Sequence, residues 1–203
     1  MVEDKNVMKT GTTTVAMVCK DGAVLCADKR VTSGYLVSYK TYEKIVQITD
    51  NVAVTVAGTV SDVQLMIKLL RSELKLKDLR SGRRSSVKEA VNLLANMVYN
   101  NIRKFSTIPG ISHFVAGGMD SEGVHVYDVG ADGSTTKIDE YTSSGSGSVM
   151  AYGVLETLYK PEITVEEAVK LAVKQLMQPY NETSHLETES TSSPSPMKES
   201  KKY

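Results

Sequence analysis

The sequence predicts an α+β protein in which antiparallel sheets are covered by helices. β-forming runs come first, two helical segments follow, and strands and then helices return in the second half. Elements grouped in this way, instead of alternating strand by helix, favour antiparallel sheets with helices layered outside over a doubly wound parallel sheet. The length of 203 residues suits one domain, or one domain with a tail.

Two strand pairs are predicted in the first quarter of the chain. The runs Thr13–Cys19 and Ala23–Asp28 are joined by Lys20-Asp21-Gly22, and Asp-Gly between apolar runs is a strong hairpin signal. The runs Lys44–Ile48 and Val52–Ala57 follow. The last of these is apolar at nearly every residue, as expected of a strand that is covered on both faces.

Helical periodicity replaces this pattern from Ser61 onward. Apolar residues recur every three or four positions at Val63, Met66, Ile67, Leu70 and Leu74. Ser61 or Asp62 is the expected cap of this helix. After a basic connector at residues 80–84, Ser85 or Ser86 opens a second helix.

Strands return at His113–Gly117, Val124–Val129 and Thr135–Ile138. The small-residue loop 143–148 then leads into a third helix, and Thr164 opens a fourth helix with a capping box. Because the loop lacks the lysine of a phosphate-binding loop, close backbone packing is the favoured interpretation.

Charge and residue content argue against several functions. Lys+Arg and Asp+Glu both number 24, so we expect no nucleic-acid partner and no anionic membrane partner. No apolar run approaches the roughly 18 residues that span a bilayer, and Met1–Gly11 lacks the apolar core of a secretory signal. Cys19 and Cys26 lie in apolar runs, as expected of reduced core residues in a cytosolic protein. The three histidines have no metal-ligand spacing, so we expect no metal and no cofactor.

The most informative stretch is Thr10-Gly11-Thr12-Thr13-Thr14-Val15. If the bond between Gly11 and Thr12 is cut, Thr12 carries both a hydroxyl and a free α-amine, which is the nucleophile-plus-base pair of threonine hydrolases. On this stretch alone, an ordinary strand after a disordered leader is the favoured interpretation, because a motif out of context is weak evidence.

In its full context, the stretch resembles the start of archaeal proteasome core-particle β subunits, and the resemblance runs from about Met8 to Gln178. The further landmarks are Ala27-Asp28-Lys29-Arg30-Val31-Thr32, Lys44, Ala57-Gly58, Gly117-Gly118, and Ser144-Gly145-Ser146-Gly147-Ser148 before Tyr152-Gly153-Val154-Leu155-Glu156. Each landmark alone is weak, but their order and spacing together are highly specific. The resemblance implies a four-layer αββα sandwich, the N-terminal nucleophile hydrolase fold. It also implies a propeptide over residues 1–11 and a proteasome β-type domain over residues 12–178.

The resemblance further implies a threonine endopeptidase that is matured by autocleavage before Thr12. By position, Thr12 is the nucleophile, and its freed α-amine, which titrates near neutral pH, is the base. Lys44 would lie beside the hydroxyl and favour the alkoxide, and Asp28 would fix Lys44 in place. The backbone N–H of Gly58 would face the developing oxyanion, and Ser146 would orient the Thr12 amine.

Four positions match the family's pocket for the residue before the scissile bond: Val31, Tyr42, Val56 and Val60. An apolar pocket would favour cleavage after apolar residues. Without the resemblance, these four are ordinary core or strand residues, and Lys44 with Asp28 is an ordinary ion pair at strand ends.

The implied partners are other β subunits in a heptameric ring, rings of α subunits, a regulatory ATPase reached through the α rings, and unfolded polypeptide substrates. The implied location is cytoplasmic. Two alternatives stay open: a non-catalytic structural β subunit of the ring, and the related bacterial two-ring protease, which also starts with Thr-Thr. The loop Ser144–Ser148, followed by Tyr152-Gly153-Val154-Leu155, favours the proteasome.

The resemblance stops after Gln178. The family continues with Arg-Asp-x-x-Ser-Gly and an apolar strand pair, whereas residues 179–203 are polar, a composition that predicts disorder and missing C-terminal strands. The frame can be shifted by reading the third base of each codon with the first two bases of the next. Across Tyr180-Asn181 this frame encodes either a stop or glutamine, and across Asn181-Glu182 it encodes either a stop or arginine. We therefore hypothesise that a frameshift near Gln178 replaced the native C-terminus.

Overall fold

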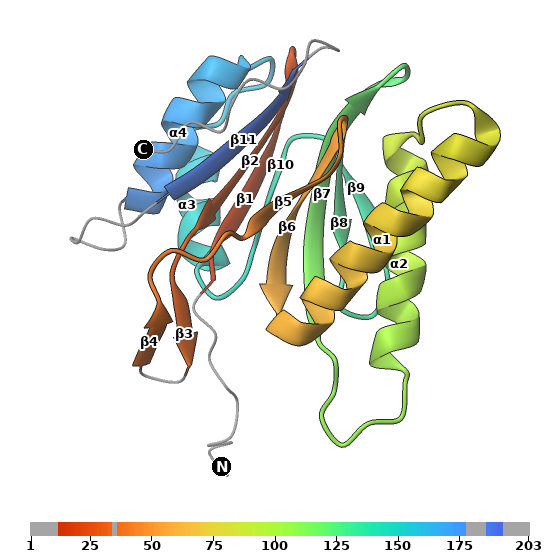
Figure 1. Ribbon diagram of the computed structural model, residues 1–203. Coiled ribbons are helices and arrows are strands. Elements are labelled where there is room, and N and C mark those ends of the chain that lie inside the picture. The colour runs from red at the N-terminus through yellow and green to blue at the C-terminus, as the bar shows by residue number, and fades with distance from the viewer. Residues whose placement is uncertain (1–11, 34–35, 178–185, 193–203) are drawn as a thin grey trace.

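The computed structural model describes residues 12–33, 36–177 and 186–192. Two antiparallel sheets pack face to face, and a pair of helices covers the outer face of each sheet (Figure 1). This arrangement is a four-layer αββα sandwich, so the predicted α+β class and the layering are confirmed.

The first sheet has the strand order β10-β1-β2-β11. Its strands are β1 (Thr14–Cys19), β2 (Gly22–Asp28), β10 (Tyr141–Ser144) and β11 (Leu186–Ser192). The β1–β2 hairpin forms at the predicted Asp-Gly turn. Helices α3 (Ser148–Leu158) and α4 (Val165–Met177) cover the outer face of this sheet.

The second sheet has the strand order β5-β6-β7-β8-β9. Its strands are β5 (Ile45–Thr49), β6 (Val52–Gly58), β7 (Ser112–Asp120), β8 (Gly123–Val129) and β9 (Thr135–Ile138). Helices α1 (Val60–Ser81) and α2 (Val87–Ile102) cover its outer face. A small hairpin of β3 (Val31–Ser33) and β4 (Leu36–Tyr39), which the sequence pattern did not predict, projects beside the sandwich (Figure 1).

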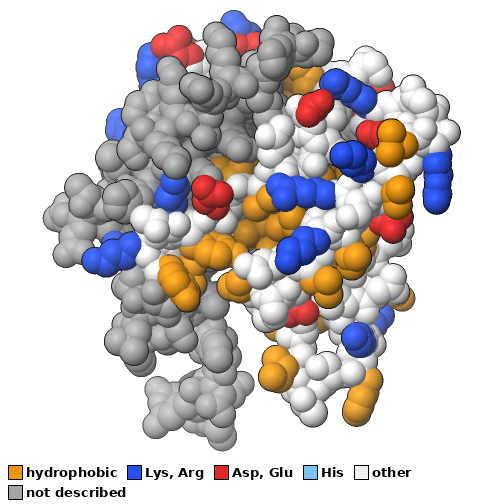
Figure 2. All heavy atoms as spheres, viewed as in Figure 1, with side chains coloured by type: hydrophobic (Ala, Val, Ile, Leu, Met, Phe, Trp, Pro, Cys, Tyr) orange, Lys and Arg blue, Asp and Glu red, His pale blue; other side chains and the backbone are white. Residues whose placement is uncertain are grey.

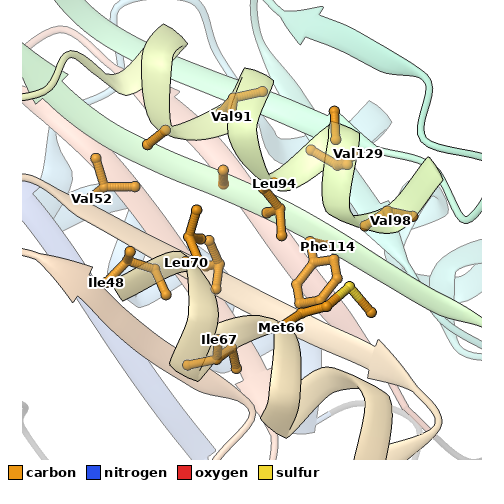
Figure 3. Close-up of a cluster of buried hydrophobic side chains, with 14 of the residues drawn as sticks. Ile48, Val52, Met66, Ile67, Leu70, Val91, Leu94, Val98, Phe114 and Val129 are labelled. Carbon is orange, nitrogen blue, oxygen red and sulfur yellow. The ribbon is translucent and has the colours of Figure 1, made fainter. Parts of the chain in front are cut away.

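Three apolar layers hold the sandwich together. Alternate residues of the two sheets meet between them, including Leu25, Val115 and Val126. The opposite faces pack under the helices, and Figure 3 shows α1 and α2 placing Leu70 and Leu94 over the second sheet. Burying one leucine or valine side chain fully contributes about 1.5–3 kcal/mol to the free energy of folding. The apolar stripes of α1 and α2, which the sequence pattern predicts, therefore contribute strongly to this packing.

The helix starts differ in how well they were predicted. Ser86 caps α2 in a capping box, because its side chain accepts from the Glu89 N–H and the Glu89 carboxylate accepts from the Ser86 N–H. The expected cap of α1 at Ser61 or Asp62 is wrong. The N-cap is Thr59, because the chain turns directly from the end of β6 into the helix, and the Thr59 N–H donates to the Ile111 carbonyl instead.

The expectation that residues 179–203 contain no strand is wrong for Leu186–Ser192, which pair with all of β2 as β11. A strand pairs through its backbone N–H and C=O groups, so a polar sequence can also add a strand to a sheet. Residues 178–185 and 193–203 lie outside the described residues.

The surface of α1 leaves large apolar side chains exposed, and Figure 2 shows hydrophobic groups among Lys and Arg on this face. They are Val60, Leu65, Leu69, Leu76 and Leu79. Among the helices that the structure describes, none is long and apolar enough to cross a membrane.

Candidate active site

The candidate active site lies at one end of the sandwich, where the ends of both sheets meet. Thr12 lies just before β1, and Asp28 ends β2, the neighbouring strand. Two hydrogen bonds join these ends: the Thr13 N–H donates to Asp28 Oδ1 at 2.7 Å, and the Asp28 N–H donates to the Thr13 carbonyl at 3.1 Å. The hairpin register therefore places the Asp28 carboxylate beside Thr12.

Lys44 reaches this carboxylate from the other sheet, where it lies just before β5. Its Nζ lies 2.9 and 3.0 Å from the two Asp28 carboxylate oxygens, 2.6 Å from the Arg30 carbonyl oxygen and 3.2 Å from Thr12 Oγ1. The residue is 3% exposed. Burial lowers the pKa of the Lys44 ammonium, and the Asp28 charge and hydrogen bond oppose this effect. The result is a buried, ion-paired cation aimed at a hydroxyl.

The turn between β10 and α3 lies against Thr12. The Thr12 N–H donates to Ser146 Oγ at 3.3 Å, and the Gly147 N–H donates to the Thr12 carbonyl at 3.3 Å. Gly145 has a φ of +91°, and a Cβ at this position would collide with the Thr12 carbonyl oxygen. A glycine is required here for both reasons.

Gly58 ends β6, in the sheet opposite Thr12, with a φ of +118°. A Cβ there would collide with the Ile111 carbonyl oxygen. The lack of a side chain thus allows β6 to end in close contact with Ile111. That the Gly58 N–H faces an oxyanion stays a prediction.

The family model described as proteasome subunit matches residues 8–185. The chain belongs to the proteasome subunit family.

The chain is 43% identical over 176 residues to a proteasome subunit beta of Methanospirillum hungatei, and the match covers 87% of this chain and 82% of the relative. Identity is 40% over 176 residues to the proteasome subunit beta of Methanocorpusculum labreanum, covering 87% and 81% of the two chains. It is 40% over 174 residues to that of Archaeoglobus fulgidus, covering 86% and 79%. These proteasome relatives support a β subunit of the proteasome core.

Of the residues that the proteasome resemblance selects, Thr12, Asp28, Lys44 and Ser146 come together, and Gly11 lies outside the described residues. Their roles are tested by none of these contacts and stay predictions.

The four residues predicted to line the pocket differ in how far their side chains are exposed. Val31 and Tyr42 are partly buried, and Val60, the first residue of α1, is 40% exposed. Val56 is 5% exposed and packs in the cluster beneath α1 and α2. Pocket lining stays a prediction for all four.

The first sheet also holds the chain's two cysteines. Cys19 and Cys26 are both buried, as predicted, and burial together with the nearby Asp21 raises the pKa of the Cys19 thiol to about 12. Within residues 12–33, 36–177 and 186–192, no group of three or more His, Cys, Asp or Glu side chains is placed to hold a metal ion.

Sequence reasoning missed three polar residues beside the site. Ser144 Oγ lies 2.6 Å from His113 Nδ1, and His113 Nε2 lies 2.7 Å from Asp128 Oδ1. Strand alternation places His113 on the same face of β7 as Val115, which points toward the other sheet. That alternation is the one available signal, and it does not reveal which residue lies opposite.

Proposed function

We propose that this chain is a catalytic β subunit of the proteasome core particle, a threonine-type endopeptidase that degrades unfolded proteins to peptides. The observation that carries the proposal is the position of Lys44 Nζ, 3.2 Å from Thr12 Oγ1 and paired with Asp28. A buried positive charge beside a hydroxyl stabilises the alkoxide, and a threonine hydroxyl needs such activation to act as a nucleophile.

The chain would first act on itself. Thr12 Oγ1 adds to the Gly11 carbonyl carbon, the Gly11–Thr12 C–N bond breaks, and the hydroxyl proton passes to the leaving Thr12 nitrogen. Water then hydrolyses the resulting ester, which releases the leader with a Gly11 carboxylate and restores the Thr12 hydroxyl. In the uncut chain, the nitrogen that donates to Ser146 Oγ is a peptide amide. After cleavage it becomes the α-amine, and Ser146 remains available to orient it.

Peptide cleavage would then use the same atoms. The α-amine accepts the Thr12 hydroxyl proton, directly or through a water, as Oγ1 adds to the scissile carbonyl carbon. The proton passes to the leaving amine, and water hydrolyses the acyl-enzyme. The Gly58 N–H is proposed to stabilise the oxyanion, and Val31, Tyr42, Val56 and Val60 to line an apolar pocket for the residue before the scissile bond.

Assembly is part of the proposal. We expect β subunits in a seven-membered ring stacked between α rings, with a regulatory ATPase acting through the α rings, in the cytoplasm. The large apolar side chains that α1 leaves exposed support a contact with another subunit on this face, because exposed apolar surface is a common feature of interfaces.

The decisive experiment measures the intact mass of the chain from particles assembled with the α partner. A mass that begins at Thr12, together with loss of peptide cleavage in Thr12→Ala and retention in Thr12→Ser, supports the proposal. A mass matching Met1 to Tyr203, with Thr12→Ala behaving as wild type, would instead support a structural subunit. The same spectrum tests the frameshift hypothesis, because a shifted C-terminus has a different mass.

A further inference from the structure

The hydrogen-bonded chain Ser144–His113–Asp128 connects the two sheets beside the candidate active site. His113 lies on β7 and Asp128 on β8, both in the second sheet, whereas Ser144 ends β10 in the first. Neither His113 nor Asp128 takes part in the proposed reaction. The contact of His113 with Ser144, and that of Asp128 with His113, therefore need a separate explanation.

The donors in this chain have a defined order. A carboxylate can accept but not donate, so His113 Nε2 carries the hydrogen that it gives to Asp128. In the neutral imidazole the other nitrogen, Nδ1, is then an acceptor, and the Ser144 hydroxyl donates to it. Asp128 thus selects the ring form that can hold Ser144.

Serine hydrolases use a similar order of groups to activate a nucleophile, but Ser144 is 5% exposed and closed off from a substrate carbonyl. The position of Ser144 in the chain indicates a different role. The next three residues form the turn that holds Thr12 through Ser146 Oγ and the Gly147 N–H.

We propose that His113, oriented by Asp128, is a positioning residue that fixes Ser144 and so holds the Gly145–Gly147 turn against Thr12. On its β1 side the turn is anchored within its own sheet, where the Ser144 carbonyl accepts from Thr14 Oγ1 at 3.4 Å. His113 supplies an anchor from the opposite sheet. This proposal rests on the proposed function, because precise placement of the turn matters for activity only if Thr12 is the nucleophile.

Amide hydrogen exchange in the full-length chain tests the anchor without requiring activity. The Gly147 and Ser148 amides, which donate to the Thr12 and Gly145 carbonyls, should exchange about tenfold faster in His113→Ala, because loss of the partly buried His113–Ser144 hydrogen bond favours local opening. His113→Asn keeps an acceptor near the Nδ1 position and should restore protection. His113→Gln reaches Asp128 but not Ser144 and should not.

His125→Asn is the matched control. His125 also pairs with an aspartate, Asp120, at 3.4 Å, but at the far end of the β7–β8 pair. The exchange of the Gly147 and Ser148 amides should stay at the wild-type rate in this variant. If His113→Ala shows wild-type exchange, or if the asparagine and glutamine variants behave alike, the positioning role is wrong.

Kinetics of assembled particles separate this proposal from the proposed function. We expect kcat to fall about tenfold in His113→Ala with KM unchanged and to recover in His113→Asn, since the substrate pocket is untouched. A change in KM alone would contradict a positioning role. If exchange follows the expected pattern while wild-type particles show no Thr12-dependent cleavage, the turn is held as proposed and the peptidase function is the part that fails.

Discussion

Lys44 Nζ lies 3.2 Å from Thr12 Oγ1 although the two residues precede strands of different sheets. Thr12 is held by the β1–β2 hairpin end and by the turn before α3, whereas Lys44 comes from the start of β5. Neither sheet alone contains the site. The close packing between the sheets, which buries small residues such as Ala16 and Ala53, sets the distance between hydroxyl and ammonium.

Replacing Lys44 should remove activity and part of the stability. Lys44→Met leaves the Asp28 charge without its cation, and we expect a loss of about 2 kcal/mol in the free energy of unfolding, because Asp28 keeps two backbone N–H donors. Peptide cleavage should fall at least about 100-fold. Urea unfolding and cleavage assays measure both quantities, and Lys170→Met, which removes an exposed lysine, is the control. Cleavage within twofold of wild type in Lys44→Met would contradict a catalytic role.

A methyl group at Gly145 should disturb Thr12 directly. Gly145→Ala combines a positive φ with a collision against the Thr12 carbonyl, so we expect a cost of about 1–3 kcal/mol and loss of processing. Gly82→Ala is the matched control, because Gly82 has a φ of +66° but open space around its Cα. It should cost about 1 kcal/mol and leave cleavage unchanged. Equal effects of the two variants on processing would show that backbone strain, and not contact with Thr12, is responsible.

Glu89 should make stability depend on pH in the acid range. Hydrogen bonds from Arg83, Lys77 and the Ser86 N–H hold the pKa of Glu89 well below its usual range in the folded state. Its stabilising contribution is therefore complete above the unfolded pKa of about 4.3 and is lost progressively as pH falls below it. Glu89→Gln should lower the free energy of unfolding by about 1 kcal/mol at pH 7, since these pairs are largely exposed. The difference from wild type should shrink at pH 3, and a difference that grows on acidification would contradict the prediction.

The two thiols should be unreactive in the folded chain. Cys19 and Cys26 are buried, and the raised pKa of Cys19 leaves a very small thiolate fraction at neutral pH. Iodoacetamide at pH 8 should add no mass to the native protein within minutes and two carbamidomethyl groups in urea. Rapid labelling of the native chain would mean that the first sheet opens readily.

Local signals account for the elements that could be read from the sequence. Each of these signals depends on residues that are close together in the sequence. They are the Asp-Gly hairpin, the apolar stripes of α1 and α2, and the capping box at Ser86. β10 was missed because Tyr141–Ser144 becomes a strand through pairing with β1, more than 100 residues away. A polar four-residue segment carries no sign of such a partner.

The site shows the same division. Asp28 follows Thr12 by 16 residues and Lys44 follows Thr12 by 32, and no local pattern joins the three. The resemblance to a known family, and not periodicity, therefore selected them. His113 and Asp128 correspond to no landmark of that resemblance and were found through their contacts. Cross-sheet distances depend on packing of whole layers, which a linear sequence does not display.

The pairing of β11 with β2 also bears on the behaviour of the protein at high concentration. Without this neighbour, the entire length of β2 would present unpaired backbone donors and acceptors next to an apolar core, the kind of edge that recruits strands from other molecules. β11 pairs along that edge, and its seven residues include two Glu and a single large apolar residue, a composition less prone to recruit a further strand than an apolar one. In this chain β11 therefore covers a strand edge that would otherwise be open to pairing with another molecule.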